Sequence, residues 1–125
     1  MGSVFVNGEI LTLNACDELA EALLTVGDEI YFVGDREDAL SLADADTEVV
    51  DLGGRALLSL SAYRLFPEVA RRTDDWREVP RLLRRLGGAC LEWGAPAELV
   101  VLSGRVIGCQ PQMLSGLVPS RGETR

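Results

Sequence analysis

The chain has 125 residues, a formal net charge of −8 and a hydrophobic fraction of 47%. This length suits one domain with a usable core, and the apolar fraction is typical of a globular protein and not of a disordered one. Residues 1–58 hold thirteen acidic residues against two arginines, whereas residues 59–125 hold ten arginines against seven acidic residues, and an acidic front half argues against binding to nucleic-acid phosphates.

The first half predicts short strands joined by tight turns. Residues 4–6 and 10–13 flank Asn7-Gly8, a strong hairpin signal because both turn positions need positive φ. Residues 14–21 are polar and predict a loop or a single helical turn. A second hairpin is predicted for residues 22–33, with its turn at Gly27-Asp28-Glu29.

A short helix and two further strands complete this half. Asp35 is suited to cap a helix of two to three turns that ends near residue 43. Residues 47–52 alternate and are rich in valine, which predicts a strand. Gly53-Gly54 then predicts a tight turn, and residues 55–58 a partner strand.

The second half begins with a helical pattern. Pro67 lies within it, so the helix either begins near Phe66, with the proline in its first turn, or is kinked. The apolar residues at helical spacing are Ala62, Leu65, Phe66, Val69 and Ala70.

A second helix is predicted between a cap at Asp74 or Asp75 and an end at Gly87-Gly88, with Pro80 in its first turn. Its apolar face consists of Val79, Leu82, Leu83 and Leu86. Its polar face consists of Arg77, Arg81, Arg84 and Arg85. Such an arginine-rich face is usually solvated, and less often it is a binding surface.

Together these elements predict one α+β domain, a small antiparallel β-sandwich with two or three amphipathic helices packed on it. The domain is expected to span residues 1–109, and residues 110–125, rich in polar residues and glycine, are expected to form a flexible tail. Within the domain, residues 1–58 are the β-rich part, 59–88 the helical part and 97–109 a closing β-hairpin around Ser103-Gly104. The alternative is that residues 59–125 are an unrelated continuation of the chain.

Three pieces of the first half resemble the amidohydrolase superfamily of metal-dependent hydrolases. They are residues 6–10 (VNGEI), residues 22–30 (ALLTVGDEI) with Val33-Gly34, and residues 48–55 (EVVDLGGR), in the order and spacing of that family. The resemblance covers residues 4–58 and implies the composite domain, a small β-sandwich beside a metal-binding TIM barrel. Residues 97–102 (AELVVL) are similar to the strands that close this sandwich.

In the family, the strand after the Asp-Leu-Gly-Gly turn leads to two histidines that bind the catalytic metal. Laid on that pattern without gaps, the two positions hold Leu65 and Pro67, which cannot bind a metal. A catalytic barrel of ~250 residues also exceeds this chain. The resemblance therefore implies no catalytic, cofactor-binding or metal-binding residue here.

The composition removes several chemistries as well. The chain has no histidine and no lysine, so the usual general base, the commonest metal ligand and Schiff-base chemistry are absent. No such base is available to activate a serine, whether Ser59, Ser61 or Ser103. The cysteines form no C-x-x-C pair and predict reduced, mostly buried thiols of a cytosolic protein: Cys16, Cys90 and Cys109.

The remaining candidates have plainer explanations. Asp44, Asp46 and Glu48 alternate as cation ligands do, but the ligand number and turn glycine of a calcium loop are missing, which favours a solvated loop. The carboxylates of Asp35, Glu37 and Asp38 suit a helix start. Trp76 and Trp93 are expected to pack in the core, with a partner contact as the alternative.

The sequence thus predicts a non-catalytic amidohydrolase-like β-module that serves as a structural or protein-interaction domain. The alternative is a remnant or subunit of a metal-dependent amidohydrolase that needs a separate catalytic barrel. We expect a second copy or another protein as partner, no membrane, no nucleic acid, no cofactor and a cytoplasmic location.

Overall fold

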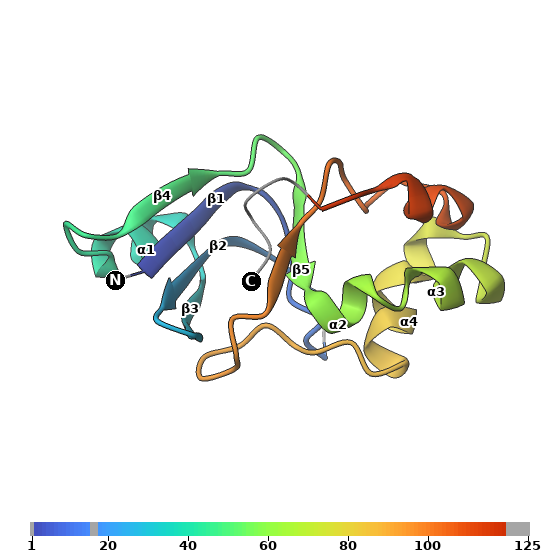
Figure 1. Ribbon diagram of the computed structural model, residues 1–125, viewed down its shortest axis with the longest axis horizontal. Coiled ribbons are helices and arrows are strands. Elements are labelled where there is room, and N and C mark those ends of the chain that lie inside the picture. The colour runs from blue at the N-terminus through green and yellow to red at the C-terminus, as the bar shows by residue number, and fades with distance from the viewer. Residues whose placement is uncertain (1, 16–17, 120–125) are drawn as a thin grey trace.

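The computed structural model describes residues 2–15 and 18–119, so Cys16 lies outside the described part. The strands are β1 (Gly2–Leu11), β2 (Leu19–Val26), β3 (Glu29–Gly34), β4 (Glu48–Asp51), β5 (Ala56–Ser59) and β6 (Leu99–Val101). The helices are α1 (Arg36–Leu42), α2 (Leu60–Tyr63), α3 (Phe66–Arg72) and α4 (Val79–Arg85), with the short 3-10 helices η1 (Trp76–Glu78) and η2 (Pro111–Gly116). Figure 1 shows β1–β4 and α1 at one end of the molecule and α2–α4 with η2 at the other.

The strands form one mixed sheet in the order β3-β2-β1-β5-β6, with β4 also paired to β1. β1 runs antiparallel to β2 but parallel to β4 and β5. The predicted α+β class is therefore confirmed, whereas the antiparallel sandwich is not.

The hairpin predicted at Asn7-Gly8 is wrong, because both residues lie inside the single strand β1. Asn7 does adopt a positive φ of 62°, but this produces an irregularity in the strand and no reversal. β1 pairs with β4 before this point and with β5 after it. The predicted pairing of residues 55–58 with the preceding strand is wrong for the same reason: β4 and β5 lie one after the other along β1.

Close backbone contact explains why glycine follows Asn7. A Cβ atom on Gly8 would lie 2.5 Å from the carbonyl oxygen of Arg55. Hydrogen bonds join the two chain segments on either side, with Gly54 N donating to Asn7 O over 2.8 Å and Glu9 N donating to Arg55 O over 3.0 Å. The Gly53-Gly54 turn, with φ of 58° and 86°, thus packs directly on the middle of β1.

The carboxylate of Asp51 stabilises this contact. Its Oδ1 accepts hydrogen bonds from Asn7 Nδ2 over 2.9 Å and from Gly53 N over 2.8 Å. These bonds, first the one from Asn7, hold the pKa of Asp51 below its ordinary value.

Most other predictions for the first half are confirmed. The loop predicted for residues 14–21 is too long, because residues 19–21 already belong to β2. Asp35 is the N-cap of α1, but its side chain makes no capping hydrogen bond. Residues 22–33 form the β2–β3 hairpin, with Gly27 at a φ of 61°. α1 follows Asp35, and β4 lies within the predicted strand 47–52.

The helical predictions are also confirmed. Pro67 lies in the first turn of α3, and Pro80 in the first turn of α4. Asp75 caps η1, since its carboxylate accepts a hydrogen bond from Arg77 N over 3.0 Å. Gly87 follows α4 with a φ of 106°.

Two predictions for the end of the chain are wrong. β6 pairs with β5, and residues 106–107 form no strand, so there is no closing hairpin around Ser103-Gly104. The expected tail is ordered from Gln110 to Pro119, because Pro111 and Leu114 of η2 are buried. Residues 120–125 lie outside the described part of the chain.

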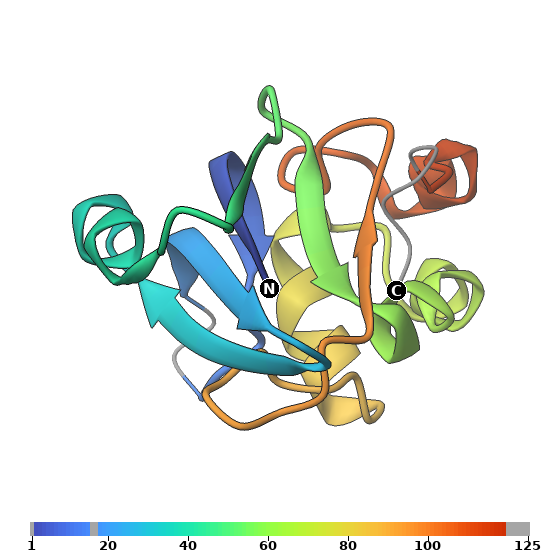
Figure 2. The ribbon, with the colours of Figure 1, turned by 60° about the vertical axis from the view of Figure 1, so that its left-hand side comes forward.

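The sheet curls so that its two arms, β2–β3 and β5–β6, face each other (Figure 2). One core cluster lies between them, and we call it the inner cluster: Phe5, Ile10, Leu23, Ile30, Leu52, Leu57, Leu91, Ala97, Leu99 and Val101. The segment 94–97 crosses from one arm to the other, with Ile30 N donating to Ala95 O and Ala97 N to Asp28 O, each over 2.8 Å. This segment thus covers the first residues of the β3 edge and then leads into β6.

Two further clusters lie on the outside of the curled sheet. α1 covers the smaller one, which consists of Val4, Val6, Ala22, Leu24 and Ala39. The helical end of the molecule covers the larger one, in which Leu11 and Leu58 of the first half pack with Phe66, Leu83 and Leu114 of the second. Residues 59–119 therefore share a core with the β-rich half.

A buried carboxylate ties the first strand to the end of the chain. Glu9 is 5% exposed, and its Oε1 accepts hydrogen bonds from Val106 N over 2.9 Å and Ile107 N over 3.1 Å. Arg105 Nε donates to the other oxygen, Oε2, over 2.7 Å. The backbone amides of Val106 and Ile107 need no strand partner because Glu9 accepts a hydrogen bond from each.

Replacing this carboxylate should destabilise the fold. We expect Glu9→Gln to lower the free energy of unfolding by about 1–3 kcal/mol, because charge-assisted bonds in a buried site are lost. Urea denaturation measures the effect, with Glu98→Gln as the control because Glu98 is exposed. Equal midpoints for both variants would contradict this role of Glu9.

The close approach of the Arg55 carbonyl to Gly8 gives a second stability prediction. Gly8→Ala should lower the free energy of unfolding by about 1–3 kcal/mol, because the new methyl group would overlap the Arg55 carbonyl. Gly116→Ala is the matched control, since a Cβ there would meet nothing within 4 Å. The midpoints of thermal unfolding of the two variants are compared. Equal midpoints would show that the backbone at Gly8 has room for a methyl group.

Candidate functional site

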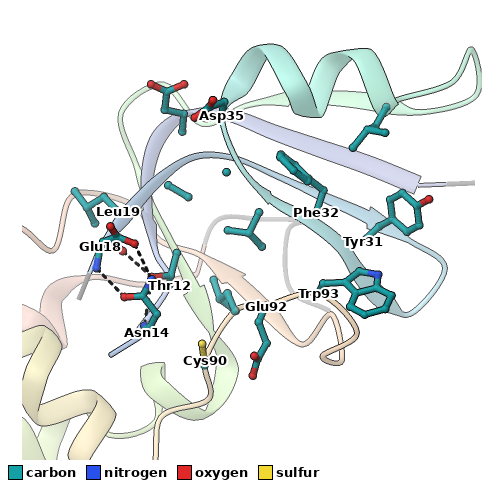
Figure 3. A pocket seen from close by; sticks show the side chains of 16 residues that line it. Thr12, Asn14, Glu18, Leu19, Tyr31, Phe32, Asp35, Cys90, Glu92 and Trp93 are labelled. Atoms are coloured by element: carbon teal, nitrogen blue, oxygen red, sulfur yellow. Dashed lines mark hydrogen bonds between the residues drawn. The ribbon is translucent and has the colours of Figure 1, made fainter. Parts of the chain in front are cut away.

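A groove of about 800 Å³ runs along β3, between the end of α1 and residues 90–93. In Figure 3, Tyr31 and Trp93 lie together at one end, and Glu18 and Leu19 lie at the other. The lining residues are Thr12, Asn14, Glu18–Glu21, Tyr31–Asp35, Leu42 and Cys90–Trp93. Several segments, some of them far apart in sequence, therefore form one concave surface.

Several large apolar side chains of this groove face solvent. The exposed fractions are 76% for Trp93, 49% for Tyr31, 50% for Leu19 and 49% for Leu42. A concave surface that leaves this many apolar side chains in water is typical of a place where another molecule docks.

An irregularity in β3 places Tyr31 in the groove. Ile30 pairs with Thr25 and Phe32 with Leu24, so Tyr31 is an extra residue without a cross-strand partner. Ile30 consequently packs in the inner cluster, whereas Phe32 packs against the cluster beneath α1. Bulges of this kind redirect side chains at sheet edges.

The rim of the groove is acidic. Glu18, Glu21, Asp35 and Glu92 line it, and none of the described lining residues is basic. Asn14 Nδ2 donates to Glu18 Oε2, and Arg36 N donates to Glu21 Oε1, each over 3.0 Å. These bonds position two of the carboxylates, and the negative charge of the rim favours cationic ligands.

Cys90 lines the same groove but is not activated. The thiol is partly buried, and this burial raises the pKa of Cys90, with a smaller contribution from the charge of Glu92. Burial raises the pKa of the Cys109 thiol as well. Both cysteines are free, and neither has the lowered pKa that a nucleophilic thiolate requires.

The positions that correspond to the metal-binding histidines do not fit a metal. β5 ends at Ser59, so Leu65 lies in the turn before α3 and Pro67 in the first turn of that helix. Neither side chain offers a donor atom. Within residues 2–15 and 18–119, no group of three acidic, cysteine or histidine side chains is placed to hold a metal ion.

The alternating carboxylates near β4 form a local turn. Asp44 Oδ1 accepts hydrogen bonds from Asp46 N over 2.9 Å and from Thr47 Oγ1 over 3.0 Å. These bonds, first the one from Thr47, lower the pKa of Asp44. Asp44 and Glu48 are exposed, and the structure does not bring these carboxylates together with the groove.

The three serines have structural roles. Ser59 Oγ caps α2 by accepting from Ala62 N over 3.3 Å, and Ser61 Oγ accepts from Ala89 N over 2.9 Å. Ser103 Oγ accepts from Val118 N over 3.2 Å.

The predictions for the tryptophans and for the arginine-rich face are only partly confirmed. Trp76 is half-buried, as expected of a packing residue, but the expectation that Trp93 packs in the core is wrong. Arg81 and Arg85 are exposed on α4, and Arg77 pairs with Asp75. Arg84 instead donates to the carbonyl of Ala15 over 3.3 Å, so the four arginines do not act as one surface.

Sequence reasoning missed the groove itself. Its residues come from the segment after β1, from β2, β3 and α1, and from the segment before β6, and only their spatial arrangement makes them a site. The signals available in sequence were Tyr31 in an otherwise apolar strand and Trp93 beside Gly94 in a loop. Neither signal indicates a groove without the fold.

No family model matches the chain. The search of curated proteins likewise found no match. No helix in the described part of the chain is long and apolar enough to cross a membrane.

Solved structures give partial matches. Two uncharacterized metal-dependent hydrolases, from Pyrococcus horikoshii OT3 and Pyrococcus furiosus, are each 21% identical with a TM-score of 0.42, and the matches cover 56% and 70% of this chain. Dihydropyrimidinase from Brevibacillus agri NCHU1002 is 25% identical over 47% of this chain, with a TM-score of 0.36. The matches span 16%, 21% and 11% of those chains, respectively.

Part of this chain is similar to a part of metal-dependent hydrolases and amidohydrolases. The chain covers about a fifth or less of the length of the two Pyrococcus hydrolases.

The state of Cys90 can be checked by alkylation. Because its pKa is raised, we expect iodoacetamide to modify Cys90 more slowly at pH 7.5 than it modifies the cysteine of an unstructured peptide with the same flanking residues. The rate should rise with pH and reach half its maximum above the pH at which the free thiol does. Peptide mapping by mass spectrometry follows Cys90 alone, and fast labelling at pH 7.5 would instead indicate an activated thiolate.

Proposed function

We propose that this chain is a non-catalytic amidohydrolase-like module that acts as a structural or protein-interaction domain. The observation that carries the proposal is the groove beside β3, which exposes Leu19, Tyr31, Leu42 and Trp93. In this proposal, the curled sheet is the counterpart of the composite-domain sandwich. The module works in the cytoplasm as an oligomer or with a protein partner.

The chemistry of the described side chains supports a non-catalytic role. The groove contains acidic residues, a thiol with a raised pKa and exposed apolar side chains. General acid–base catalysis needs a group that titrates near neutral pH, and nucleophilic catalysis needs an activated side chain. The groove has neither histidine nor lysine to provide these functions.

The alternative is a subunit that completes a separately encoded catalytic barrel. One observation favours it: the two segments that resemble the family at the start and end of its sandwich lie side by side. Leu57, which follows the Gly53-Gly54 turn, pairs with Val101, and Leu58 pairs with Val100. Recovery of hydrolysis only after addition of a barrel chain would support this alternative over the first proposal.

Metal content and hydrolysis test the non-catalytic proposal. We expect purified protein to contain far less than one zinc or manganese ion per chain, because Leu65 and Pro67 offer no ligand. We also expect no hydrolysis of amide, dihydropyrimidine or ester substrates above the uncatalysed rate. Elemental analysis and a chromatographic assay measure both, and stoichiometric metal together with turnover would overturn the proposal.

A further inference from the structure

The edge of β3 is only partly covered. β3 is the outermost strand of the sheet, and the segment 94–97 hydrogen-bonds to its first residues and to the turn before it. Gly94 N donates to Ile30 O over 2.8 Å, and Pro96 bridges Glu29 in antiparallel fashion. In the described chain, no backbone hydrogen bond joins Val33 or Gly34 to any strand other than β2.

The groove follows this uncovered part of the edge. Residues 31–35 line it on one side. Residues 90–93, which precede the segment 94–97, line it on the other. An unpaired strand edge exposes backbone donors and acceptors and readily accepts another strand. Here Tyr31, Trp93, Leu19 and Leu42 expose apolar side chains in the groove beside that edge.

The charge of the rim selects among possible strands. Glu18, Glu21, Asp35 and Glu92 surround the groove, with no basic residue among its described lining. A second copy that paired through the same edge would bring these carboxylates against their own counterparts, which like-charge repulsion opposes. None of the described strands contains an arginine, and exposed arginines such as Arg81 and Arg85 lie on α4, so no strand of the described chain carries the cationic side chains that would suit this rim.

We propose that the groove binds an extended segment of another protein, which adds to β3 as a strand and carries alternating aliphatic and arginine or lysine side chains. The main chain of the segment pairs with the backbone of residues 32–34. Its aliphatic side chains contact Tyr31 and Trp93, while its cationic side chains face the acidic rim. This mode of recognition combines main-chain hydrogen bonds with side-chain specificity. The inference rests on the proposed interaction role and assigns the site and the chemistry of the partner.

Synthetic peptides test the inference on the full chain. The probe is a fluorescein-labelled eight-residue peptide that alternates valine with arginine, and its affinity is measured by fluorescence anisotropy. Two comparison peptides replace every arginine by glutamate, or one central valine by proline, which removes a backbone donor. We expect measurable binding of the basic peptide alone, and weaker binding as NaCl rises from about 50 to 500 mM.

Substitutions locate the binding site. Trp93→Ala should weaken binding at least about fivefold, because exposed aromatic anchors dominate such contacts. Met113→Ala, which truncates an exposed side chain at the helical end, should leave the affinity unchanged. Glu92→Arg should weaken binding about threefold or more, whereas the matched charge change Asp74→Arg should not. Hydrogen exchange should show that the bound peptide newly protects those amides of residues 32–34 that do not donate to β2.

The outcomes separate this inference from the proposed function. Binding that survives Trp93→Ala and protects other residues would overturn the β3 site and leave an interaction role intact. If light scattering detects a dimer, hydrogen exchange shows protection at β3 in that dimer, and no peptide binds, then the occupant of the groove is a second copy of this chain and the inference of a partner strand is overturned. Absence of both peptide binding and self-association would overturn the inference, whereas metal-dependent turnover would overturn the non-catalytic function itself.

Discussion

The contact between the middle of β1 and the Gly53-Gly54 turn is the constraint on which the rest of the sheet depends. Gly8 allows the backbone of residues 52–55 to approach β1, and hydrogen bonds from Leu52 N, Gly54 N and Glu9 N close the contact. Because of it, β4 and β5 share one side of β1, and the sheet curls around the inner cluster. Glu9, the next residue, holds residues 105–107 in place and so extends the same contact to the end of the chain.

The groove is a consequence of how this curled sheet is closed. The segment 94–97 joins the β3 edge only at Asp28–Ile30 and then continues into β6. Leu99 and Val101 of β6 are part of the inner cluster. No strand among residues 2–15 and 18–119 covers the rest of the edge, since the chain before Gly94 runs toward Thr12, whose carbonyl accepts from Leu91 N over 2.8 Å. Leu91 is buried, but its neighbours Glu92 and Trp93 are exposed. The same connection therefore completes the core and leaves an apolar, acidic groove beside it.

Local patterns predicted most elements well where a residue's effect depends only on its neighbours. Gly27-Asp28 forms a hairpin turn, Pro67 and Pro80 lie in the first turns of their helices, and Asp75 caps η1. The failures occurred where a distant segment decided the outcome. Asn7-Gly8 has the composition of a turn, but residues 52–55 occupy the space beside Gly8 and keep β1 continuous. Pro111 and Leu114 lie in a polar segment, yet the helical end of the molecule buries them.

The sequence by itself determined the class of the fold, the resemblance of residues 4–58 to metal-dependent hydrolases, and the chemistry that is missing. The chain has no histidine, and Leu65 and Pro67 carry no donor side chain, so it offers no histidine ligand in any conformation. Only the tertiary structure decided the pairing of β1 with three strands, the burial of Glu9 and the exposure of Trp93. The physical reason is that side-chain composition acts locally, whereas strand pairing, burial and concavity depend on which distant segments come into contact.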